Sequence, residues 1–164
     1  MKANRVLAAA TLAVAALLSV PDAPALAAGP FFFEGDMVRG RTQDGASGPT
    51  CVLTSEFKRK EPVVWRLRIR DAKGEPVDQK GMKTVAIALP DGKTFDMKFG
   101  PHPRGKTDDY FWTTSWEIPA DYPTGTIGFK VVATDLDGKT HEWKPFNVEL
   151  SWLKIIPGDV TFTK

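Results

Sequence analysis

The sequence is poor in the residues that carry most protein chemistry. It has one cysteine and two histidines in 164 residues, so no disulfide can form within one chain. The formal charges nearly cancel, with 22 Lys and Arg against 20 Asp and Glu. This balance argues against nucleic-acid binding, which requires a strong basic excess. No G-x-S-x-G motif, phosphate loop or zinc-ligand spacing is present, so an enzyme is the least favoured function class.

Helical periodicity is also missing. The chain instead contains short runs in which apolar and polar residues alternate, separated by turn residues at a spacing of roughly 8–12 residues. Two such runs, 111–118 and 126–134, flank a segment rich in turn formers, and the Asp137-Gly138 pair that follows them is a hairpin signal. These features are typical of an all-β sandwich.

We expect an antiparallel β-sandwich of about seven to nine strands over residues 50–156. In the run 63–70 the apolar residues include Trp65 and alternate with arginines, so one face of this strand is predicted to be core and the other polar. Trp116 is expected in the core for the same reason. The predicted strands are 50–57, 63–70, 85–89, 94–99, 111–118, 126–134 and 140–150.

The first 27 residues have the pattern of a secretory signal peptide. Lys2 and Arg5 precede the apolar run 6–20, and Ala25-Leu26-Ala27 supplies a cleavage site. The run is too short to cross a hydrocarbon core of ~30 Å. We therefore expect cleavage after Ala27, no membrane span in the mature chain, and a location in the bacterial periplasm or outside the cell.

The segment 28–49 precedes the expected sandwich, and the segment 157–164 follows it as a short tail. Three consecutive phenylalanines, 31–33, lie near the start of the mature chain. We expect one or two of these rings to be buried by a first edge strand. Residues 39–49 are rich in glycine and polar side chains and are predicted to be a loop.

Part of the chain resembles a known class of domain. Cys51 on one expected strand and Trp65 on the next resemble the immunoglobulin pattern of a strand-B cysteine and a strand-C tryptophan. The segment 118–138, with its Ile-Pro pair, its Tyr-Pro-Thr-Gly-Thr corner and its Val-Val-Ala-Thr-Asp strand, resembles the closing hairpin of bacterial Ig-like and fibronectin-III-like secreted domains. The resemblance covers roughly residues 50–150 and implies an Ig-like sandwich, but such folds serve many functions.

The resemblance also implies a position for Cys51 in the core. No second cysteine is present on the strand 126–134, so the inter-sheet disulfide of the family is absent. Val131 or Ala133 is expected to occupy its place, and Cys51 is expected to be a small buried hydrophobic residue.

One alternative uses Cys51, His102 and His141 as ligands. Together with a methionine they match the ligand set of a type-1 copper site, which would make the protein a periplasmic copper-binding or redox-accessory protein. The spacing does not support this alternative, because cupredoxins place these ligands close together near the C-terminus. We favour a protein without a cofactor, with both histidines on the surface.

Two surface features suggest binding of another protein. Arg66, Arg68 and Arg70 leave the same face of one expected strand, and Glu56 is the main acidic residue expected nearby. The loop 102–112 combines an imidazole, cations and aromatic rings at a strand end, where sandwiches often bind. Its candidate binding residues are His102, Arg104, Lys106 and Tyr110. The hypothesis from the sequence is an exported, non-catalytic binding or accessory module that docks a periplasmic protein.

Overall fold

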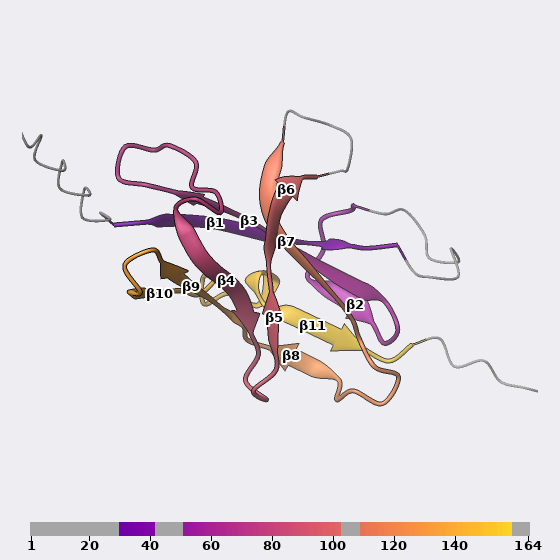
Figure 1. Ribbon diagram of the computed structural model, residues 1–164. Coiled ribbons are helices and arrows are strands. Elements are labelled where there is room, and N and C mark those ends of the chain that lie inside the picture. The colour runs from indigo at the N-terminus through magenta and orange to yellow at the C-terminus, as the bar shows by residue number, and fades with distance from the viewer. Residues whose placement is uncertain (1–29, 42–50, 103–108, 159–164) are drawn as a thin grey trace, which may run out of the picture.

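The described part of the chain, residues 30–41, 51–102 and 109–158 of a computed structural model, is an all-β sandwich (Figure 1). It contains eleven strands and one short 3-10 helix. The expected signal peptide, Arg104 and Lys106 lie outside these residues. Within the described residues, no helix is long and apolar enough to cross a membrane.

The first sheet has the order β1-β3-β7-β6 and is antiparallel throughout. Its strands are β1 (Phe32–Arg39), β3 (Pro62–Arg70), β6 (Lys98–Pro101) and β7 (Tyr110–Glu117). The edge strand predicted after residue 27 is therefore confirmed, and Phe31 and Phe33 pack against the core. In β3 the alternation is as expected, with Val63, Trp65, Leu67 and Ile69 all buried.

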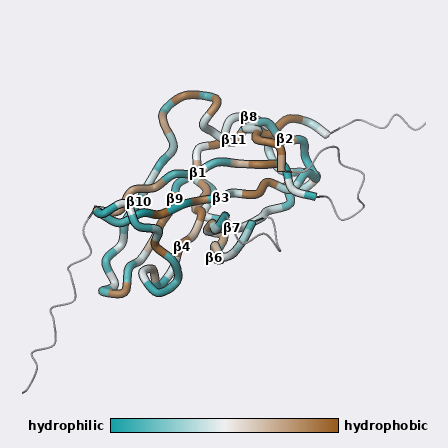
Figure 2. The backbone as a smooth tube through the Cα atoms, turned by 90° about the horizontal axis from the view of Figure 1, so that it is seen from above, coloured by the Kyte–Doolittle hydropathy of each residue, from teal (hydrophilic) through white to brown (hydrophobic). Residues whose placement is uncertain are grey.

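The second sheet has the order β10-β9-β4-β5 and packs on the first. Its strands are β4 (Met82–Ala88), β5 (Thr94–Asp96), β9 (Lys130–Asp135) and β10 (Thr140–Trp143). A third sheet contains β2 (Glu56–Lys58), β8 (Gly125–Ile127) and β11 (Leu153–Ile156), of which β11 and β2 run parallel. From above, this third sheet lies at one end of the molecule and β10, β9 and β4 lie toward the other (Figure 2).

Two predicted strands are each divided between sheets, so the strand count is higher than expected. The run 94–99 becomes β5 in the second sheet and β6 in the first, and the run 126–134 becomes β8 in the third sheet and β9 in the second. Met97 and Phe129, at the two breaks, stay buried. The backbone thus changes partners at these corners while the inward side chain keeps its place in the core.

A cluster of aromatic rings forms the centre of the core. Trp65 is 1% exposed and stacks on Phe95 and Trp116 at centroid distances of 5.9 and 6.4 Å. Phe129 meets the same indole edge-on at 5.9 Å. The predictions that Trp65 and Trp116 are core residues are confirmed, as is the burial of Val131 and Ala133.

The predicted strand 50–57 and the predicted burial of Cys51 are wrong. Cys51 is exposed and has a φ of 60°, and Leu53 is exposed as well. The cause is the path of the chain, because residues 51–54 run along the outer edge of β1. There the Cys51 N–H donates to the Arg39 carbonyl and the Thr54 N–H donates to the Met37 carbonyl. Regular pairing begins only at β2.

The predicted strand 140–150 is also too long. β10 ends at Trp143, and the chain then passes through an irregular segment and a 3-10 helix, η1 (Glu149–Ser151), before β11. Proline at position 145 lacks the N–H that a continuing strand would donate. The apolar residues Phe146, Val148 and Leu150 are consequently exposed.

Candidate functional site

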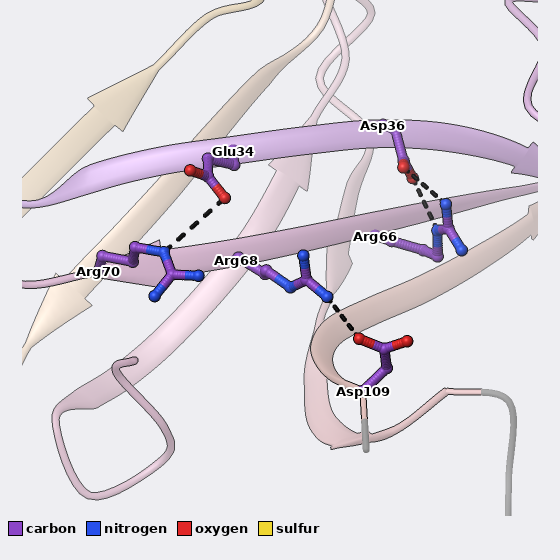
Figure 3. A network of polar contacts seen from close by, with 6 residues as sticks. All are labelled: Glu34, Asp36, Arg66, Arg68, Arg70 and Asp109. Atoms are coloured by element: carbon purple, nitrogen blue, oxygen red, sulfur yellow. Dashed lines mark hydrogen bonds and ion pairs between the residues drawn. The ribbon is translucent and has the colours of Figure 1, made fainter. Parts of the chain in front are cut away.

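The three arginines of β3 form one polar surface, which we call the arginine face (Figure 3). Arg66 holds Asp36 of β1 with two parallel hydrogen bonds, Nε to Oδ1 at 2.7 Å and Nη2 to Oδ2 at 2.6 Å. Arg68 donates to Asp109 at 2.7 Å. The bidentate geometry is the stronger kind of arginine–carboxylate pair, and the Arg66 side chain is only 18% exposed.

The remaining arginine has a looser partner. Arg70 Nε lies 3.9 Å from Glu34 Oε2, and the two side chains are 39% and 61% exposed. The expectation that Glu56 is the main acidic residue near these arginines is therefore wrong. Their neighbours are β1 and the start of β7, not the segments assumed from the sequence, and Glu56 instead pairs with Lys154 at 3.0 Å.

Phe111 lies against two of these guanidinium groups. The Arg68 and Arg66 guanidinium carbons are 4.3 and 5.2 Å from the ring centroid, within the range of a cation–π interaction. The hydrogen bond to Asp36 raises the pKa of Arg66, although burial opposes this shift. Ion pairs and an aromatic ring thus hold the arginine face in place, which leaves it little free charge for a partner.

The loop that contains the other predicted binding residues is described only at its ends. The His102 N–H donates to the Asp109 carbonyl at 2.9 Å, and its ring meets Phe111 edge-on at 6.3 Å. Burial, and then the charge of Arg66, lower the pKa of His102. Tyr110 is exposed and stacks on Phe99 at 5.7 Å. His102 therefore borders the arginine face through Phe111.

The structure does not bring the alternative metal ligands, Cys51, His102 and His141, together into a metal site. Within the described residues, no group of three or more His, Cys, Asp or Glu side chains could hold a metal ion. Cys51 lies on the exposed segment beside β1. The His141 Nε2 instead lies 2.8 Å from Asp135 Oδ2, and this contact lowers the pKa of Asp135, which also accepts the Lys139 N–H at 2.9 Å. Asp135 thus closes the β9–β10 hairpin, which contains the predicted Asp137-Gly138 turn.

A second candidate site lies along the edge of β1 that faces away from β3. A groove of about 690 Å³, which we call the β1 groove, separates the edge of β1 from the segment 143–151. Trp143 of β10 and Phe129, which directly precedes β9, also line it. A methyl group on Gly35 would come within 3.2 Å of the Trp143 ring, so the absence of a side chain at Gly35 lets this indole pack directly against β1.

Exposed apolar side chains gather around the β1 groove. Phe146 is 83% exposed, Leu150 85% and Leu53 64%, and all three line it. Phe146 and Leu150 come from the connection between β10 and β11, whereas Leu53 comes from the segment beside β1. A cluster of exposed apolar residues on one surface marks an interaction site more often than scattered ones do.

The backbone edge of β1 is open beside the same groove. Backbone groups of an antiparallel strand point alternately to its two neighbours. The Met37 carbonyl accepts the Thr54 N–H at 3.2 Å, on the side away from β3. The backbone N–H and C=O groups of Phe33 and Gly35 point to the same side as those of Met37. No other segment of the described chain forms a backbone hydrogen bond with Phe33 or Gly35 on that side.

Sequence analysis found the arginine face but missed the β1 groove. Leu53 falls in the predicted strand 50–57, and Phe146 and Leu150 fall in the predicted strand 140–150. The available signal was Pro145, which interrupts the second of these runs and sends the following apolar residues out of the sheet. Comparison with protein-family models, with curated proteins and with solved structures finds no match for this chain.

Proposed function

We propose that this protein is an exported, non-catalytic module that binds another protein through the β1 groove. The observation that carries the proposal is the coincidence of exposed Phe146, Leu150 and Leu53 around one groove that borders an open strand edge. Burial of exposed apolar surface away from water favours protein–protein association. Exported location is supported by the signal-peptide pattern of residues 1–27.

The arginine face has a supporting role in this proposal. Its charges are paired within the first sheet, so they hold β1 in position beside the groove. Complementary charge mainly speeds association and selects partners. We therefore place the docking surface that the sequence suggested at the β1 groove and not on the arginines.

A site-specific photo-crosslinker tests this placement in the cells that produce the protein. It is introduced in place of Phe146 in one variant and in place of Leu136 in another. Leu136 is the matched control, because it is 64% exposed but lies on the β9–β10 turn, away from the groove. We expect a discrete heavier product from the Phe146 variant alone. Absence of such a product, or equal products from both variants, would contradict the proposal.

A further inference from the structure

The open edge and the groove together indicate how a partner would bind. Phe33 and Gly35 direct their N–H and C=O groups to the groove side, and Gly35 is exposed. The chain itself already uses the rest of this edge, since Leu53 forms an antiparallel bridge with Val38. After Thr54 the chain leaves the edge of β1 and joins the third sheet. There the Ser55 carbonyl accepts the Lys154 N–H at 2.7 Å. The edge is thus strand-paired at one half and open at the other.

An added strand would place its alternate side chains in two different environments. Those beside Phe33 and Gly35 would face the groove, with Trp143 and Phe146 around them. Those beside Glu34 and Asp36 would lie on the outer face, where Asp36 is held by Arg66 but the exposed Glu34 carboxylate has only a long pair with Arg70 at 3.9 Å. Apolar residues suit the first set of positions. Lysine or arginine suits the second, because opposite charges on adjacent strands are favourable.

A second copy of this chain is a poorer occupant. Two-fold pairing of β1 with itself, centred on Gly35, opposes Glu34 of one copy with Asp36 of the other. Pairing centred on Glu34 opposes two glutamates. Like charges directly across two strands are destabilising, so self-pairing is disfavoured in these two registers.

We propose that the β1 groove receives an extended segment of another protein, which adds to β1 as a strand. This segment pairs its backbone with Phe33 and Gly35 and alternates apolar residues with basic ones. The inference rests on the proposed function, of which it names the ligand class and the binding mode. Strand addition of this kind takes affinity from main-chain hydrogen bonds and specificity from alternate side chains.

Two short peptides test the ligand class. One alternates valine with lysine and the other valine with glutamate. Binding is followed by NMR on the isotope-labelled protein. We expect the valine–lysine peptide to shift the amide signals of Phe33 and Gly35 and the indole signal of Trp143, and to bind roughly tenfold more tightly than its acidic counterpart. The Glu34→Lys variant should instead bind the valine–glutamate peptide more tightly than the valine–lysine peptide. Binding of neither peptide at millimolar concentration, equal binding of both, or signals that shift elsewhere would overturn the inference.

A matched pair of variants tests the backbone contact. Phe33→Ala and Phe33→Pro both remove the ring, but only proline removes the outward N–H, and proline is tolerated on an edge strand. The proline variant should bind the valine–lysine peptide roughly fivefold more weakly than the alanine variant. Equal affinities would overturn strand addition. So would concentration-dependent dimers of the wild type that Phe33→Pro abolishes, because the occupant would then be a second copy. If position 146 crosslinks to a partner but neither peptide binds, the proposed function is retained and strand addition is rejected.

Discussion

The two surfaces that border β1 differ in whether their polar groups have partners within the fold. On the arginine face, the outward side chains of β1 and β3 pair with each other, as the Asp36–Arg66 contact at 2.6 Å shows. In the β1 groove, the same strand leaves backbone groups unpaired within the described chain, beside exposed Phe146 and Leu150. Charged residues that look free in a sequence can be internally neutralised, whereas apolar residues that look like core can lie exposed on the surface.

The aromatic core supports both surfaces, so its loss should have the largest effect. Trp65→Ala removes the ring that contacts Phe95, Trp116 and Phe129, and we expect a loss of about 3–5 kcal/mol in the free energy of unfolding. Urea denaturation measures it. Trp65→Phe is the control and should lose clearly less, because the Trp65 Nε1 has no hydrogen-bond partner within the described chain. An alanine variant that loses less than about 1 kcal/mol would show that this ring is not central to the core.

Breaking the arginine face should cost less. Asp36→Asn leaves Arg66 without a charged partner, and we expect a loss of about 1 kcal/mol in unfolding free energy because the pair is bidentate and partly buried. Glu34→Gln is the matched control on the same strand. Its loss should stay within about 0.5 kcal/mol, because the Glu34–Arg70 pair is long and exposed. Equal losses would mean that the internal pairing described here does not stabilise the sheet.

Acid should weaken the arginine face through His102. Burial and Arg66 lower the pKa of His102 below its usual value of 6.5, so the folded state favours the neutral ring. A depressed pKa contributes stability that is present above pH 6.5 and is lost as the pH falls through the folded-state value. We expect unfolding free energy to fall between pH 7.5 and 5, and to fall less in His102→Gln. The difference between the two proteins isolates His102 from His141, and identical pH profiles would contradict this role.

Removal of an exposed apolar side chain of the β1 groove should have the smallest effect on stability. Phe146→Ser is expected to change the unfolding free energy by no more than about 0.5 kcal/mol, because the ring is 83% exposed. Thermal and urea denaturation test this, with Leu136→Ser as the control on the distant turn. A loss near 2 kcal/mol or more would show that Phe146 belongs to the folding core and would remove the sharpest contrast between the two surfaces.

The alternation of side chains allowed the sequence to predict which faces are buried. Trp65 and Trp116 lie in regular two-residue patterns, and both are core residues as expected. The same patterns placed Arg66, Arg68 and Arg70 together on one face. This part of the fold follows from local chemistry, because the strand period alone decides the direction of each side chain.

Strand neighbours could not be predicted in the same way. Asp36 meets Arg66 only because β1 pairs with β3, across a separation of 30 residues in the chain. Apolar alternation also does not reveal where a strand leaves its sheet. Cys51 and Leu53 match a strand pattern but lie outside the core, since the turn at Cys51 has a positive φ and directs the chain along the edge of β1.

Hydrogen exchange along β1 in the free protein tests the central claim most directly. The amides of Glu34 and Asp36 point to β3, whereas those of Phe33 and Gly35 point to the groove. We expect alternating protection, with the amides of Phe33 and Gly35 exchanging faster than those of Glu34 and Asp36 by roughly a hundredfold or more. If Gly35 is protected as strongly as Asp36 in the free protein, the edge is already covered and the β1 groove is not an open site for a partner strand.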